Sequence, residues 1–172
     1  MIIHCTQKLA AKLPCISETA LTETHPLGSW HANLYVIDRR QCVMFCHDAT
    51  RFVLLVAGLK KQDFSNLEFR FNDLFANTLL KLDFEHELIH RALSHLDALQ
   101  FDTVCNRSVQ GSMRTVRMAE LEALLMDVPD VMQLPIYSTS ARLNKRPVTI
   151  KGMKKSECLW PYKAMRSFIE KL

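Results

Sequence analysis

The chain has 172 residues, of which 48% are hydrophobic and 23% charged, with a formal net charge of +4 at neutral pH. With only four Gly and six Pro, this composition excludes collagen-like repeats, long disordered tracts and small disulfide scaffolds. The length favours one domain over residues 1–172, large enough to bury a substantial core.

The N-terminal third predicts an antiparallel sheet. Strands are expected over residues 1–6, 30–37, 41–47 and 50–57, with a short helix over 7–13 that Thr6 caps and Pro14 ends. The connections among the last three strands are too short for parallel crossovers. Strands 41–47 and 50–57 are apolar on both faces, which indicates that helices cover both sides of the sheet.

Helical patterns dominate the rest of the chain. Ser65 and Glu68 fit a capping box, and the apolar spacing behind them predicts a helix that reaches Leu82. Further helices are expected over 84–96, 108–126 and 161–172, with a short strand over 99–104 and irregular chain from 127 to 160. The sequence therefore predicts an α+β fold, an antiparallel sheet from the N-terminal third covered by helices.

Six cysteines show neither a C-x-x-C pair nor regular spacing. The first residues lack the basic and apolar regions of a signal peptide, and the longest apolar run, Phe52–Leu59, is far too short to cross a bilayer. We therefore expect a cytoplasmic protein with reduced thiols and no membrane association.

The segment His86-Glu87-Leu88-Ile89-His90 forms an H-E-x-x-H string inside a predicted helix. Two His four residues apart can bind one zinc ion, and the Glu can act as a general base on metal-bound water. Glu120 is the candidate third ligand. The alternative is that His86 and His90 are solvent-facing residues at the edge of an apolar stripe. We predict no metal or other cofactor and keep a zinc-dependent hydrolase as the alternative.

Cys42, Cys46 and His47 resemble metal ligands until strand geometry is applied. Along a strand, Cys42 and Cys46 lie roughly 13 Å apart, which excludes a shared zinc ion and a disulfide. Cys46 and His47 point to opposite faces of the strand. We interpret both cysteines as core residues.

The positive charge lies in the C-terminal part of the chain. Residues 1–102 hold 10 Lys and Arg against 12 Asp and Glu, whereas residues 103–172 hold 12 against 6. A basic stretch near Tyr137, Trp160 and Tyr162 could bind nucleic acid through phosphate contacts and base stacking, or could be a solvated loop. Its cations are Arg142, Lys145, Arg146, Lys151, Lys154 and Lys155.

A polar segment, Asn106-Arg107-Ser108-Val109-Gln110-Gly111-Ser112-Met113, begins the helix predicted over 108–126. Asn106 or Ser108 can cap that helix, and exposed N–H groups beside Arg107 attract an anion. Together with four other segments, it resembles a bacterial single-domain family of unknown function that shares an N-R-S-V-x-G-S-M segment. The other segments are Thr6-Gln7-Lys8-Leu9-Ala10, Trp30-His31-Ala32-Asn33, Arg39-Arg40-Gln41-Cys42-Val43 and Leu143-Asn144-x-x-Pro147.

The resemblance implies a small bacterial cytosolic protein without an assigned activity. We predict a non-enzymatic binding module for an anionic partner, either a nucleic acid or a phosphorylated ligand. The residues expected to border its binding surface are Lys8, Trp30, Asn33, Asn106, Arg107, Ser108 and Ser112.

Overall fold

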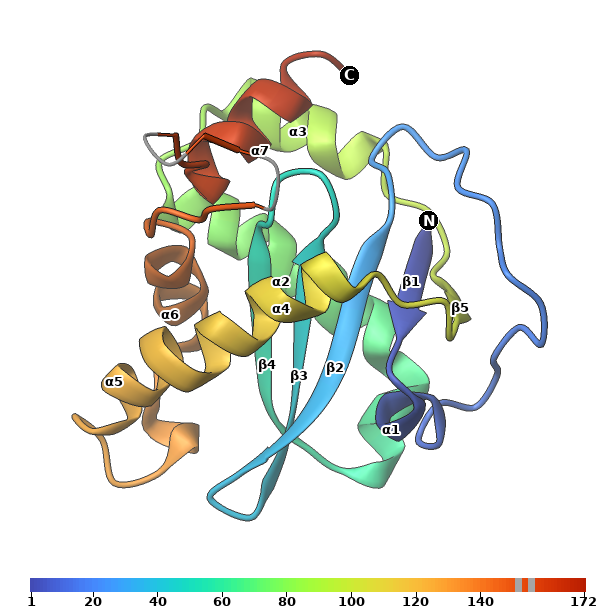
Figure 1. Ribbon diagram of the computed structural model, residues 1–172, viewed down its shortest axis with the longest axis vertical. Helices are drawn as coiled ribbons and strands as arrows, with labels where there is room; N and C mark the ends of the chain where they lie inside the picture. Colours follow the sequence, from blue (N-terminus) through green and yellow to red (C-terminus); the bar gives the residue numbers. More distant parts are fainter. Residues whose placement is uncertain (151–152, 155–156) are drawn as a thin grey trace.

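A computed structural model describes residues 1–150, 153–154 and 157–172. The fold is α+β, with a five-stranded sheet in the order β4-β3-β2-β1-β5. The strands are β1 (Ile2–Cys5), β2 (Trp30–Ile37), β3 (Arg40–His47), β4 (Val53–Leu59) and β5 (Gln100–Asp102). Figure 1 shows the sheet with β4 and β5 at its two edges.

The sheet is mostly antiparallel, as predicted, and it also contains parallel pairs, which makes it mixed. Strands β2, β3 and β4 form the predicted antiparallel meander, but β1 pairs in parallel with both β2 and β5. Strand β5 also lies outside the N-terminal third. Asp38 and Arg39 join β2 to β3 with positive φ angles of 48° and 63°, as a two-residue hairpin turn requires.

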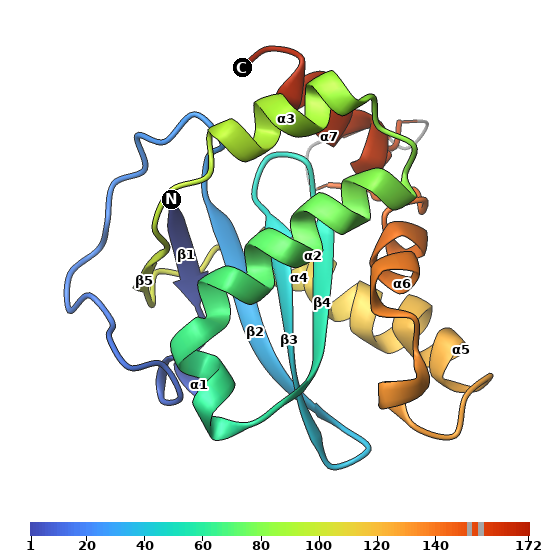
Figure 2. The ribbon, with the colours of Figure 1, turned by 180° about the vertical axis from the view of Figure 1, so that it is seen from behind.

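Helices cover both faces of the sheet, as the two-sided apolar strands predicted. On one face lie α2 (Leu67–Lys81), α3 (His86–Ser94) and α7 (Pro161–Ile169), seen in Figure 2. The other face packs against α4 (Arg107–Thr115), the π-helical segment η2 (Val116–Leu121) and α5 (Glu122–Leu125). Helix α6 (Ile136–Leu143) runs beside the edge strand β4, and α1 (Gln7–Ala10) follows β1. Short 3₁₀ turns span Lys61–Asn66 and Val131–Gln133.

Side chains of β3 alternate between two hydrophobic cores. Val43 and Phe45 join the core under α2, whereas Cys42, Met44 and Cys46 join the core under α4. All six cysteines are free thiols, and Cys42 and Cys46 are buried, which confirms them as core residues. In the described part of the chain, no helix has both the length and the apolar character needed to cross a bilayer.

Two predicted helix caps are wrong. Thr6 does not cap α1, because its hydroxyl donates instead to Asn33 Oδ1 at 2.9 Å. The expected box of Ser65 and Glu68 is replaced by a turn that begins earlier, at Lys61, and Glu68 accepts from the backbone N–H of Leu99 at 2.9 Å. In both cases a tertiary partner takes the side chain that local capping would use.

Candidate functional site

Helix α4 presents one polar face and one buried face. Val109 and Met113 are buried against the sheet. The opposite face carries three hydroxyl groups around a glycine at helical spacing, namely Ser108, Gly111, Ser112 and Thr115. This face lines a pocket of about 500 Å³, which we call the α4 pocket. Its other lining residues are Glu120 on η2 and the segment Arg146, Pro147, Val148 and Thr149.

The start of α4 is fixed by a histidine of β2. The Asn106 side chain caps the helix by accepting from the Ser108 N–H at 2.8 Å. The Asn106 N–H donates to His31 Nε2 at 2.6 Å, so the ring proton of neutral His31 lies on Nδ1. That proton faces Asp48 Oδ1 at 2.6 Å. The buried His31 thus ties the first turn of α4 to both β2 and the loop before β4.

A second histidine–aspartate pair lies beside the first. His4 Nδ1 is 2.6 Å from Asp102 Oδ1, and the rings of His4 and His31 are 5.0 Å apart. Burial raises the pKa of Asp102, but hydrogen bonds from the Leu21 N–H, from His4 and from the Val104 N–H together hold it below its usual value. Within residues 1–150, 153–154 and 157–172, no group of three His, Cys, Asp or Glu side chains could hold a metal ion. The two pairs connect β1 to β5 and β2 to the loop before β4.

Two buried arginines lie next to the α4 pocket. Arg51 and Arg146 are each only 6% exposed. Arg51 Nη2 donates to Ser108 Oγ at 3.3 Å, and Arg146 Nη1 donates to the Leu143 carbonyl. Among the described residues, Arg51 Nε and Arg146 Nη2 find no hydrogen-bond partner, and neither side chain forms an ion pair.

The group that lies near both arginines is a neutral thiol. Burial raises the pKa of Cys46 to about 12, although Arg51 and Arg146 both oppose that rise. Burial also lowers the pKa of Arg146, against the opposing influence of Cys46 and Glu120. Because its pKa is so far above 7, the Cys46 thiol stays uncharged at neutral pH and does not balance the charges of Arg51 and Arg146.

The predicted site residues divide into three groups. Ser108 and Ser112 line the α4 pocket, and Asn106 caps its helix. Lys8 and Arg107 are exposed, and Asn33 accepts from Thr6. Trp30 is 1% exposed and packs against Phe71 and Phe75 on the opposite face of the sheet, so the prediction that it borders this surface is wrong.

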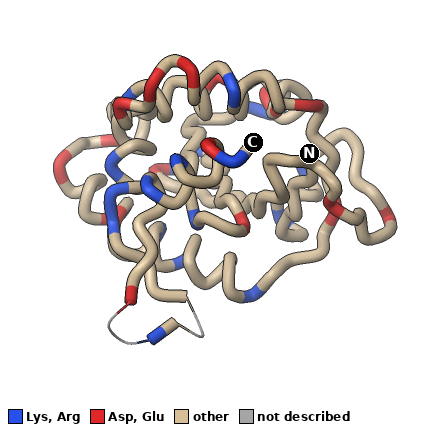
Figure 3. Tube along the Cα trace, turned by 90° about the horizontal axis from the view of Figure 1, so that it is seen from above, with Lys and Arg blue, Asp and Glu red and all other residues tan. Residues whose placement is uncertain are grey.

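The predicted basic stretch is also divided by the fold. Arg146 turns inward to the α4 pocket, whereas Arg142 and Lys145 are exposed at the end of α6. There they line a hollow of about 250 Å³ with Lys81 from α2, a residue the sequence analysis missed. Figure 3 shows Lys and Arg residues on the side of the molecule that carries α6. Lys154 is exposed, and Lys151 and Lys155 lie outside the described residues.

The H-E-x-x-H string lies on the exposed side of α3. His86, Glu87 and His90 are all exposed, while Ile89 and Ala92 face the core. Glu87 forms an ion pair with Arg91 at 3.2 Å. Glu120, the candidate third ligand, lines the α4 pocket instead.

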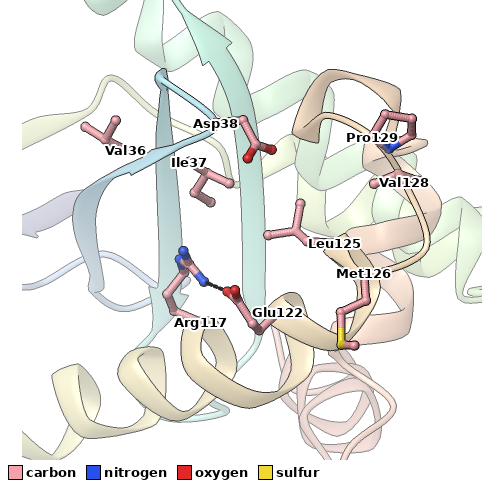
Figure 4. Close-up of a pocket in the computed structure, with 9 residues that line it drawn as sticks. All are labelled: Val36, Ile37, Asp38, Arg117, Glu122, Leu125, Met126, Val128 and Pro129. Carbon is pink, nitrogen blue, oxygen red and sulfur yellow. Dashed lines mark hydrogen bonds and ion pairs between the residues drawn. The ribbon is translucent and has the colours of Figure 1, made fainter.

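A further pocket, of about 340 Å³, lies between the β2–β3 hairpin and α5. Figure 4 shows Arg117 and Glu122 pointing toward one another on the helical side of this pocket, and the two form an ion pair. Their charges compensate each other directly, whereas Arg51 and Arg146 beside the α4 pocket form no ion pair among the described residues.

Comparison with models of protein families gives a match. The family described as Domain of unknown function (DUF6933) matches residues 2–164, nearly the full length, and the chain belongs to this family. Comparison with curated proteins and with solved structures finds no match.

Proposed function

We propose that this protein is a non-enzymatic, single-domain binding module for a small phosphorylated ligand, which it holds in the α4 pocket. The observation that carries the proposal is Arg146, a buried guanidinium that lines the pocket and forms no ion pair among the described residues. Burying a charge without a direct ion pair costs several kcal/mol, and Glu120 in the same pocket offsets part of that cost for Arg146; a bound anion would offset more of it.

The chemistry around Arg146 suits a phosphate group. A guanidinium offers planar donors that match phosphate oxygens, and the hydroxyl of Ser108 can donate while its oxygen accepts from Arg51. A pocket near 500 Å³ falls in the usual range for small-molecule sites. We prefer a small ligand to a nucleic acid at this place, because the cation involved lies inside a pocket instead of on an open surface.

The Asn106–Met113 segment supports the same assignment. We propose it as the family's ligand-binding segment, since it supplies the helix cap and two of the pocket hydroxyls. We further propose that the protein works in a bacterial cytoplasm, where its six free thiols would stay reduced.

Thermal denaturation with increasing inorganic phosphate tests the proposal. We expect the wild-type melting temperature to rise by several degrees once phosphate exceeds its dissociation constant about tenfold. Arg146→Met should lose this rise, while its melting temperature without phosphate should be unchanged or higher, because the variant removes a buried charge that forms no ion pair. Arg142→Met is the matched control and should respond like the wild type. A wild-type protein that ignores phosphate, or an Arg146→Met variant that still responds, would contradict the proposal.

A further inference from the structure

The α4 wall of the pocket is rich in hydrogen-bond acceptors. The Ser112 hydroxyl donates its proton to the Ser108 carbonyl at 3.3 Å, and the Thr115 hydroxyl donates to the Gly111 carbonyl at 3.2 Å. Both oxygens therefore offer lone pairs to a pocket occupant. Glu120 adds a carboxylate that forms no ion pair among the described residues.

Arg146, which lines the same pocket, has the reverse character. It carries only donors and forms no ion pair in the described part of the chain, although the Glu120 carboxylate lies near enough to favour its charged form. A bare phosphate satisfies Arg146 alone, because its oxygens would repel the lone pairs of Ser112, Thr115 and Glu120. A ligand that satisfies both kinds of group needs one anionic group and several hydrogen-bond donors.

We infer that the ligand is a phosphorylated polyol, such as a sugar phosphate, with its phosphate toward Arg146 and its hydroxyl groups toward Ser112, Thr115 and Glu120. This inference rests on the proposed function and assigns its substrate class. Hydroxyl groups fit better than one ammonium group, because the three acceptors are spread along α4 and η2 and need donors at separate points. A sugar carries such donors on neighbouring carbons.

Gly111 gives access to this wall. A Cβ added at Gly111 would meet no heavy atom within 4 Å, although its neighbours on the helix face all line the pocket. A larger side chain would start in open space at this pocket-lining position, and we expect it to occupy the space of the ligand. Gly111→Leu is therefore a blocking variant that should fold normally, and leucine favours a helix more than glycine does.

Isothermal titration of the full chain with ribose 5-phosphate, ribose and inorganic phosphate tests the inference. We expect ribose 5-phosphate to bind about tenfold more tightly than phosphate, because its hydroxyl groups add hydrogen bonds. Thr115→Val removes one acceptor at nearly constant shape and should weaken ribose 5-phosphate roughly 3- to 10-fold, with phosphate unaffected. Gly111→Leu should abolish ribose 5-phosphate binding.

Glu120→Gln should change the affinities for ribose 5-phosphate and for phosphate in opposite directions. It should weaken ribose 5-phosphate, because a charged acceptor becomes a neutral one, and it should strengthen phosphate, because a repulsive charge is lost. Glu122→Gln is the matched control: it removes the same charge close by, at the residue paired with Arg117, and should change neither affinity. Equal binding of phosphate and ribose 5-phosphate, or a Glu120→Gln variant that tightens both, would overturn the inference and leave the proposed function standing. If neither probe binds, the proposed function itself fails.

Discussion

Asn144 pairs with Val53 as a neighbouring strand would. Its Oδ1 accepts from the Val53 N–H at 2.7 Å, and its Nδ2 donates to the Val53 carbonyl at 2.7 Å. Two residues further along β4, the Leu55 N–H donates to Ser140 Oγ at 3.1 Å. Helix α6 thereby closes the edge of the sheet with side chains, so that the buried backbone groups of an edge strand are satisfied.

We predict that Asn144→Leu lowers the free energy of unfolding by about 3 kcal/mol or more. The variant leaves two buried backbone groups without hydrogen-bond partners, and each such group costs roughly 1–3 kcal/mol. Chemical denaturation monitored by circular dichroism measures the change. Ser138→Ala, at an exposed position of the same helix, should alter stability by less than about 0.5 kcal/mol. A loss below about 1 kcal/mol for Asn144→Leu would show that the edge does not depend on this side chain.

Helix α6 also shows what the sequence could not reveal. Its eight residues include three consecutive hydroxyl residues, Ser138 to Ser140, which favour helices weakly, and Pro135 precedes them. Packing on β4 stabilises the helix, and that partner lies some eighty residues earlier in the chain. By contrast, β2 was predicted with its observed bounds, because its pattern is local. The parallel pairing of β1 was missed, since a long loop separates it from β2.

In the candidate site, too, residues in a local sequence pattern were predicted, and residues positioned by tertiary packing were not. Ser108 and Ser112 were found from a local polar segment at a helix start. Arg51 was missed and Arg146 was assigned to a surface, because whether an arginine is buried depends on tertiary packing that its sequence neighbours do not show. Arg51 also has a positive φ of 56°, a conformation that local pattern does not predict for arginine.

His47 should make the stability depend on pH. Its Nε2–H donates to the Leu27 carbonyl at 2.9 Å and its Nδ1 accepts from the Thr50 hydroxyl at 2.8 Å, so the neutral ring is fully satisfied. Burial lowers its pKa to about 4. Below pH 6.5 His47 binds a proton in the unfolded chain but stays neutral in the folded chain. The free energy of unfolding therefore falls by about 3 kcal/mol in total as the pH drops from 6.5 to 4.

Denaturation midpoints between pH 4 and pH 8 measure this dependence. His47→Gln should be less stable at pH 8 but should show a flatter profile below pH 6.5, since the group that resists protonation is gone. His86→Gln, at an exposed histidine, should keep the wild-type profile. An unchanged slope in His47→Gln would assign the pH dependence to other groups.

The H-E-x-x-H string of α3 is predicted to be a surface feature. Since His86 and His90 are exposed and Glu120 lies elsewhere, purified protein should carry no stoichiometric zinc. His90→Ala should change the free energy of unfolding by less than about 0.5 kcal/mol. Metal analysis that finds one zinc ion per chain, absent from His90→Ala, would instead support the zinc-dependent hydrolase.

The hollow formed by Lys81, Arg142 and Lys145 is predicted to give weak, salt-sensitive affinity for nucleic acid. These three exposed cations come from α2, from α6 and from the turn after α6, and none forms an ion pair within the described residues. Each phosphate contact releases counterions, so binding to a single-stranded oligonucleotide should weaken with salt by a slope of about 0.7 for each contact.

Replacing all three with Ala should reduce that slope by about 2 and weaken binding alike across sequences, as fluorescence anisotropy over a salt series would measure. The control is the triple variant Lys8→Ala, Lys12→Ala and Lys60→Ala, which removes the same charge at exposed positions outside the hollow. An equal loss in both triple variants would show that net charge alone attracts the oligonucleotide. Absence of binding by the wild-type chain at low salt would refute the nucleic-acid role, while the α4 pocket, which contains none of these three cations, would be unaffected.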